Sequence, residues 1–170
     1  MKIEHSTQED IPTLMSIFKD AQQYLASLGI DQWQNGYPTE EKILSDIACK
    51  GSYVVRNDDN QIIGTTFFST DEEPTYRKIR GNWITANDAK YGVIHRIAVF
   101  ENHRGSGFAA FVFDHFEKEL IKMQCPSMRV DTHEDNLGMQ KLLLKRGYKQ
   151  CGIINILDGS ERLAFEKVLL

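Results

Sequence analysis

A glycine-containing loop, Arg104-Gly105-Ser106-Gly107-Phe108-Ala109, is the segment of this sequence best suited to chemistry. It lies between an apolar stretch typical of a strand and a stretch with helical periodicity. Glycine lets the backbone approach a ligand closely, and the first turn of a helix presents free N–H groups and the positive end of its dipole. These features predict an anion site suited to a pyrophosphate, to which the Arg104 guanidinium adds donors that fit phosphate oxygens.

Two other phosphate-binding patterns match this loop less well. A Walker loop needs Gly-Lys followed by Ser or Thr, and neither combination occurs in the sequence. Gly105, Gly107 and Ala110 satisfy the local dinucleotide pattern GxGxxA, but that fold carries the pattern after its first strand. Here the pattern lies late in the chain, behind strands expected to be antiparallel. A nucleotide-binding module using the same loop therefore stays as a less favoured alternative.

Alternating and helix-period stretches predict the elements that must position this loop. The expected strands cover residues 2–5, 52–56, 61–69, 91–100, 128–132, 148–157 and 162–169. The expected helices cover about 11–28, 39–51, 107–124 and 137–146. Turn-forming residues at 57–60 predict an antiparallel hairpin between the second and third strands. This order predicts an α/β (α+β) fold with a mixed, mostly antiparallel sheet.

The composition is that of an ordinary globular domain. Of 170 residues, 41% are hydrophobic and 26% are charged, which suits one domain over 1–170. Lys plus Arg is 20 and Asp plus Glu is 24, a net charge of −4, so we expect no nucleic-acid partner. The longest apolar run, 108–113, is far shorter than the roughly 20 residues of a membrane helix, and no secretory segment opens the chain. We therefore expect a cytoplasmic protein with no membrane partner, and three scattered cysteines without CxxC predict no metal site.

Residues 104–109, together with a second motif further along the chain, resemble two motifs of one enzyme family. The loop has the form [Q/R]-x-x-G-x-[G/A], and Ile97-Ala98-Val99 before it is similar to a cofactor strand. Downstream, Asn136, Leu142-Leu143 and Gly147-Tyr148 are similar to the second motif. The family is the GNAT superfamily of acyl-CoA-dependent N-acetyltransferases, and the element order matches it over essentially the whole chain. The resemblance implies a splayed sheet of about seven strands flanked by four helices.

The resemblance implies that acetyl-CoA is bound as a cosubstrate and that no metal is needed. Its pantetheine arm would pair with the main chain of Ile97, Ala98 and Val99, where the sheet parts and leaves strand N–H and C=O groups unpaired. Its pyrophosphate would lie on the N–H groups of Arg104, Gly105, Ser106, Gly107, Phe108 and Ala109. Asn136 and Met139 are the expected contacts from the second motif.

The implied reaction is direct attack, in a ternary complex, of a primary amine of a small molecule or peptide on the thioester. The N–H near Val99 is the implied oxyanion donor. No carboxylate lies in 91–95, so His95, with the same strand parity as Ile97 and Val99, is the candidate base. His133, a water chain, and a purely packing role for His95 stay as alternatives.

The proton donor of the family's second motif is missing. Seven residues after Asn136, where many relatives carry a tyrosine, this sequence has Leu143, which cannot donate a proton. Tyr148 occupies a position that is usually packed under the sheet, and we expect it to be structural. A thiol of pKa about 8.5 leaves fairly well as a thiolate, so turnover without this acid is reasonable. The departure also leaves a second function open, a CoA-binding GNAT-like protein with little or no turnover.

Aromatic residues in the connection 29–38 are candidates for binding the acceptor. Trp33 and Tyr37 would contact an amine by cation–π interaction, and Asp31 would attract it by charge. Alternatively, the two aromatic residues clamp this connection onto the core. Trp83, in the long polar connection 71–90, has three open roles: a substrate lid, a contact in a homodimer, or a local packing residue.

Overall fold

The computed structural model describes all 170 residues and contains eight strands and four α-helices. The strands are β1 (Lys2–His5), β2 (Ser52–Arg56), β3 (Ile62–Ser69), β4 (Ile79–Gly81), β5 (Tyr91–Val99), β6 (Ser127–Thr132), β7 (Lys149–Asn155) and β8 (Glu161–Val168). The helices are α1 (Ile11–Ser27), α2 (Glu40–Ala48), α3 (Phe108–Lys122) and α4 (Leu137–Lys145), with short 3-10 turns at Gln8–Asp10, Pro74–Tyr76 and Glu101–His103. The predicted mixed fold with four helices is confirmed. No helix is long and apolar enough to cross a membrane.

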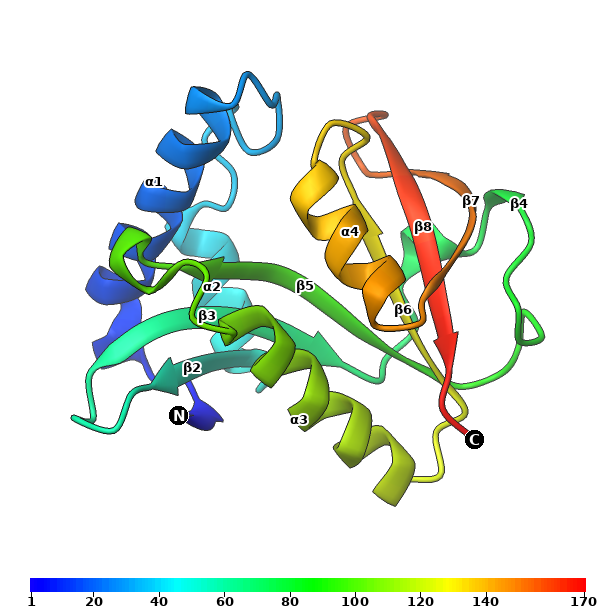
Figure 1. Ribbon diagram of the computed structural model, residues 1–170, viewed down its shortest axis with the longest axis horizontal. Helices are drawn as coiled ribbons and strands as arrows, with labels where there is room; N and C mark the ends of the chain where they lie inside the picture. Colours follow the sequence, from blue (N-terminus) through cyan, green and yellow to red (C-terminus); the bar gives the residue numbers. More distant parts are fainter. The chain divides into compact units, whose positions relative to one another are not determined.

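The strands form one sheet in the order β1-β2-β3-β5-β6-β8-β7-β4 (Figure 1). The β5–β6 pair is parallel, whereas the pairs β1–β2, β2–β3, β6–β8, β7–β8 and β4–β7 are antiparallel. The β5–β6 ladder ends after three residue pairs, from Tyr91↔Ser127 to Val93↔Arg129, as a splayed sheet requires. The eighth strand, β4, escaped prediction because three residues in a polar connection show no alternation.

The chain divides into two compact units, and each has its own core. The first comprises residues 1–68 and 96–113, and the second comprises residues 69–95 and 114–170. Strand β5 contributes residues to both units.

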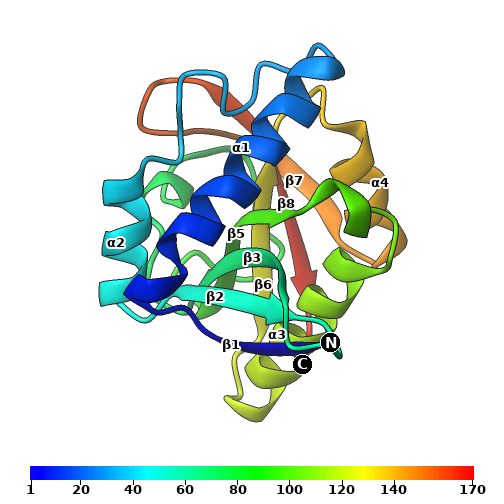
Figure 2. The same ribbon diagram turned by 90° about the vertical axis from the view of Figure 1, so that its left-hand side faces the viewer.

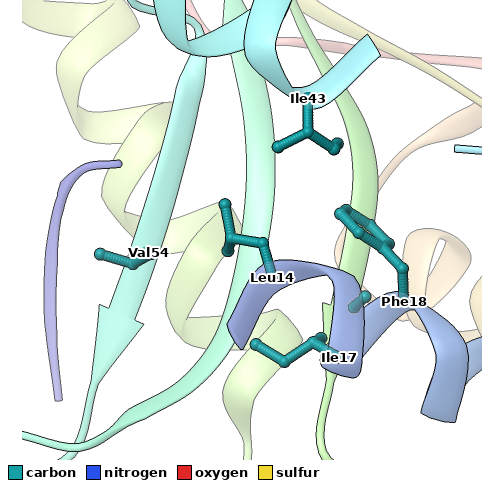
Figure 3. Packing of buried hydrophobic residues seen from close by; sticks show 6 residues of the cluster. Leu14, Ile17, Phe18, Ile43 and Val54 are labelled. Carbon is teal, nitrogen blue, oxygen red and sulfur yellow. The ribbon is translucent and has the colours of Figure 1, made fainter. Parts of the chain in front are cut away.

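In the first unit, α1 and α2 lie on one face of β2 and β3 (Figure 2). Apolar residues from both helices and from β2 form one buried cluster there (Figure 3). The buried cluster consists of Leu14, Ile17, Phe18, Ile43, Val54 and Ala98. The spacing of the α1 members is that of one helix face, which explains why this stretch forms a helix against the sheet.

Local capping explains where the elements of this unit begin and turn. The Thr39 hydroxyl accepts a hydrogen bond from the Lys42 N–H (3.2 Å) and so starts α2, as expected from the sequence. The turn between β2 and β3 is closed by Asn57 Oδ1, which accepts from the N–H groups of Asp59 (3.1 Å) and Gln61 (2.9 Å). The predicted antiparallel hairpin is confirmed.

In the second unit, a buried ion pair ties the connection after β4 to the sheet. Glu166 on β8 is 0% exposed and accepts from Arg129 Nε (3.0 Å), the Ser127 hydroxyl (2.7 Å) and the Thr85 N–H (3.2 Å). Burial raises the pKa of Glu166, but these donors outweigh it and hold the pKa below its usual value. The carboxylate therefore stays ionised inside the protein.

The Arg129 guanidinium lies between two aromatic rings, 4.4 Å from the Trp83 centroid and 4.1 Å from that of Tyr91. Trp83 is 7% exposed, and its indole N–H donates to the Tyr76 carbonyl (3.0 Å). Of the three roles left open for Trp83, local packing is the one that these contacts describe.

Replacing Arg129 by methionine should cost about 3–5 kcal/mol of unfolding free energy, because Glu166 would remain buried without its cation. Urea unfolding measures the loss. The matched control is Arg80→Met, since the Arg80–Glu161 pair (2.7 Å) is exposed and should be worth less than about 1 kcal/mol. Equal losses in the two variants would contradict the central role of the buried pair.

Candidate functional site

The glycine loop before α3 has the backbone conformation that its sequence predicts. Gly105 and Gly107 have φ values of 76° and 84°, in the left-handed region that favours glycine. Both residues are exposed, and a Cβ added at either would meet no heavy atom within 4 Å. The backbone of the loop is therefore accessible on the side where these Cβ atoms would lie.

Helix α3 begins directly after this loop. The Phe111 N–H donates to the Gly107 carbonyl (2.9 Å), so the N–H groups of Phe108, Ala109 and Ala110 precede the first bond of the helix. The Phe108 side chain is 3% exposed and packs over Gly64, where an added Cβ would lie 2.3 Å from its ring. A buried anchor therefore fixes the helix start while its backbone donors remain at the loop.

This donor set fits a pyrophosphate, because backbone N–H groups at a helix start beside two glycines are what such an anion requires. Two side chains of the loop have partners within the chain. The Ser106 hydroxyl donates to the His103 carbonyl (2.6 Å). The Arg104 guanidinium pairs with Asp20 and lies 4.1 Å from the Tyr24 ring centroid, so Arg104 is anchored to α1 and does not extend from the loop.

The end of β5 offers main chain rather than side chains to a ligand. Ala98 is 3% exposed and belongs to the core cluster of the first unit, whereas Ile97 and Val99 are half-buried. Arg96 has a φ of 53°, which interrupts the alternation of an extended strand. The expectation that His95 shares the strand parity of Ile97 and Val99 is therefore wrong, because parity does not carry through a left-handed residue.

Arg96 has a buried side chain that was not among the residues predicted from the sequence. Its side chain is 7% exposed, and Nη1 donates to the Tyr37 hydroxyl (2.9 Å). Nη2 lies 2.6 Å from Asp46 Oδ2 on α2, an ion contact outside hydrogen-bond geometry, and the guanidinium stacks 4.5 Å from the Phe67 centroid. The signal that would have identified it was an arginine between the apolar stretches 91–94 and 97–99 of one strand.

The three residues expected on the acceptor side have different surroundings. Asp31 is exposed. Trp33 packs against the first core cluster, with its ring 5.9 Å from that of Phe18 in an edge-on contact. Tyr37 is half-buried between Arg96 and Gln22, whose side-chain amide donates to the Tyr37 carbonyl (2.9 Å). Both aromatic residues thus make packing or hydrogen-bond contacts within the first unit.

His95 lies between two carboxylates in the second unit. Its Nε2 is 3.1 Å from Glu73 Oε2, and its Nδ1 is 3.5 Å from Asp131 Oδ1. Burial raises the pKa of Glu73, but the hydrogen bond and charge of His95, with bonds from Thr75, lower it to about 2. The stretch 91–95 itself has no carboxylate, and Glu73 reaches His95 from the connection 71–90, whose role the sequence left open.

The second motif positions the start of α4. Asn136 Oδ1 accepts from the Met139 N–H (3.1 Å) and caps the helix. Leu143 is 0% exposed, so the position where relatives carry an acid faces the core here. His133, the alternative base, accepts from the Asp135 N–H at Nδ1 (3.1 Å), which gives this ring a structural role ahead of α4.

Tyr148 is 2% exposed, as expected of a structural residue. Its hydroxyl donates to Glu117 Oε1 (3.0 Å), and Glu117 also binds Lys167 (2.6 Å). Burial and the charge of Glu117 raise the pKa of Tyr148 well above its usual value. The Tyr148 hydroxyl therefore stays protonated and donates its hydrogen bond to Glu117. No group of three or more His, Cys, Asp or Glu side chains is arranged to hold a metal ion.

Comparisons with known proteins agree with this architecture. A family model described as the acetyltransferase (GNAT) family matches residues 14–148. The chain is similar to a GNAT-family acetyltransferase from Streptococcus agalactiae, with 30% identity and a TM-score of 0.86 over 98% of this chain and 94% of that chain. A ribosomal-protein-alanine N-acetyltransferase from Brucella melitensis has the same fold, with 17% identity and a TM-score of 0.67 over 99% of both chains. No curated protein sequence matches.

The family match begins within α1, includes the glycine loop and ends at Tyr148, just before β7. It therefore covers both motifs that carried the resemblance in the sequence. This chain belongs to the GNAT family and is an acetyltransferase.

Proposed function

We propose that the protein transfers the acetyl group of acetyl-CoA to a primary amine of a small molecule or peptide, by direct attack in a ternary complex. The observation that carries the proposal is the exposed loop, in which Gly105 and Gly107 adopt positive φ directly before the free first turn of α3. Backbone donors at this place suit the pyrophosphate of acetyl-CoA without help from a mobile side chain.

The remaining cofactor contacts would come mainly from the backbone. The main-chain groups of Ile97 and Val99 would pair with the amides of the pantetheine arm, as an added strand would. Ala98 can contribute only main chain, because its side chain is buried in the core. Asn136 and Met139 complete the proposed set at the start of α4.

The reaction would need a base, an oxyanion donor and a leaving thiolate. An amine nitrogen attacks the thioester carbonyl carbon, and the Val99 N–H stabilises the oxygen that gains charge. His95 would accept the first proton of the acceptor ammonium. The C–S bond then breaks, and the thiolate takes the second amine proton, since neither Leu143 nor the buried Tyr148 is suited to supply one. Asp31, Trp33 and Tyr37 remain the proposed acceptor-side residues.

A second candidate function is a CoA-binding protein with little or no turnover. The buried Leu143 at the acid position favours it. Thermal-shift measurements with acetyl-CoA, ATP and NAD test the ligand, because a ligand that binds only the folded state raises its stability. Release of free thiol with a panel of primary amines then separates the two functions. Stabilisation by ATP or NAD instead of acetyl-CoA would refute both.

Gly107→Val should abolish acetyl-CoA binding, because a β-branched side chain resists positive φ and would cover the backbone donors. Isothermal titration calorimetry measures the affinity. Gly159→Val is the matched control: Gly159 has a φ of 86° and the same open surroundings, but it lies in the β7–β8 turn. Both variants should lose similar stability, and only Gly107→Val should lose affinity. Unchanged affinity in folded Gly107→Val would refute the pyrophosphate assignment.

Tyr148→Phe should lower the unfolding free energy by about 1–3 kcal/mol, because Glu117 would lose a buried donor. It should lower kcat by less than about tenfold, since no proton transfer is assigned to this hydroxyl. Thiol-release kinetics and thermal melting of the same preparation measure both effects. A hundredfold loss of kcat at unchanged stability would instead identify Tyr148 as the acid.

A further inference from the structure

Glu73 is the closest acidic partner of His95, and neither the motifs nor the comparisons assign it a role. We infer that Glu73 is a positioning residue of the acetyl transfer, which orients the His95 ring and stabilises its protonated form. The inference rests on the proposed function, in which His95 takes a proton from the acceptor.

Hydrogen bonds hold both the backbone N–H and the side-chain carboxylate of Glu73. The Thr75 N–H (3.2 Å) and the Thr75 hydroxyl (2.8 Å) donate to Glu73 Oε1, and the Glu73 N–H donates to the Tyr91 hydroxyl (3.0 Å). These bonds direct Oε2 toward His95 Nε2, 3.1 Å away. The side chains of Glu73 and His95 are only 24% and 18% exposed, so water screens their interaction weakly.

The second carboxylate, Asp131, has a different role from Glu73. Its Oδ1 accepts from the Tyr76 hydroxyl (2.7 Å) and lies further from the ring, 3.5 Å from His95 Nδ1. Burial and the charge of Asp131 raise the pKa of Tyr76 well above its usual value, so Tyr76 remains the donor to Asp131. Glu73 is therefore the main hydrogen-bond partner of the ring, while Asp131 adds charge on the opposite side.

Carboxylates on both sides of the ring favour the imidazolium that forms when His95 accepts a proton. In the proposed step, neutral His95 donates from Nε2 to Glu73 and takes the new proton at Nδ1, and the imidazolium then has N–H groups on both nitrogens, each of which faces a carboxylate oxygen. A carboxylate bonded to a histidine base fixes the ring and stabilises the cation that forms. The hydrogen bond and charge of His95 lower the pKa of Glu73 to about 2 against the effect of burial, so Glu73 is an ionised carboxylate beside the ring.

The proton balance of the step is complete without another reactant. The acceptor ammonium gives one proton to His95, and the neutral amine forms the C–N bond with the acetyl carbon. The C–S bond breaks, and the second amine proton leaves with the CoA thiolate as free thiol. His95 then returns its proton to water, so one proton is released in each turnover.

Glu73→Gln tests the role, with Glu72→Gln as the matched control, because Glu72 is the adjacent residue and pairs with exposed Arg77 instead. Glutamine keeps an oxygen for Thr75 but removes the charge beside His95. In pH–rate profiles of thiol release, Glu73→Gln should lower kcat at least about tenfold at neutral pH with little change in the KM for acetyl-CoA. Glu72→Gln should match the wild type, and Glu73→Asp should restore part of the rate.

A second measurement is independent of turnover. Carbon NMR of the Glu73 carboxyl should show its pKa rising from about 2 toward its usual value in His95→Gln, since the imidazole that lowers it is gone. Glu72 should not respond. If the pKa of Glu73 does not change in His95→Gln, the Glu73 and His95 side chains do not interact. If the pH–rate profile of folded Glu73→Gln matches that of the wild type, Glu73 has no positioning role, and the proposed function is unaffected. A wild-type protein that releases no thiol with any amine would refute the proposed function and remove this role with it.

Discussion

The left-handed conformation of Arg96 in the middle of β5 is the constraint on which the candidate site depends. A non-glycine residue at a φ of 53° costs of the order of 1–3 kcal/mol and persists only where its surroundings fix it. Asp46, the Tyr37 hydroxyl and the Phe67 ring surround the guanidinium and supply this fixation. Because Arg96 interrupts the alternation of β5, the faces on which the Ile97 and Val99 side chains lie cannot be counted from His95 by simple alternation.

Each unit buries an arginine against a carboxylate, and each pair holds a connection in place. Arg96 with Asp46 fixes the connection that contains Tyr37, and Arg129 with Glu166 fixes the segment around Trp83 and Thr85. Buried ion pairs are costly to desolvate, so their value lies in the geometry they impose rather than in net stability. Buried aromatic side chains hold the same connections: Trp33 packs against the first core cluster, and Tyr76 and Trp83 lie in the core of the second unit.

The two halves of the proposed reaction use different parts of the chain. The acetyl-CoA half relies on backbone groups of the loop 104–109 and of β5, whose positions follow from glycine conformations and from the buried Phe108. The proton-transfer half relies on side chains from separate segments: Glu73 from a connection, His95 from β5 and Asp131 from β6. A backbone site tolerates many side chains around it, whereas the proposed side-chain site would set which acceptor can be deprotonated.

The sequence by itself determined every helix and every strand except β4, the mixed sheet, the family and the place of the glycine loop before α3. Helix periodicity, the Thr39 cap, the turn at 57–60 and the two glycines act over a few residues, so they can be read without knowing the fold. Tertiary structure alone decided the partners of the charged residues. Glu73 and His95 are 22 positions apart, and neither residue carries a local signal for the other. The left-handed Arg96, which invalidated the parity of His95, was likewise visible only in the tertiary structure, because only the folded chain supplies the contacts, such as that with Asp46, that offset its strain.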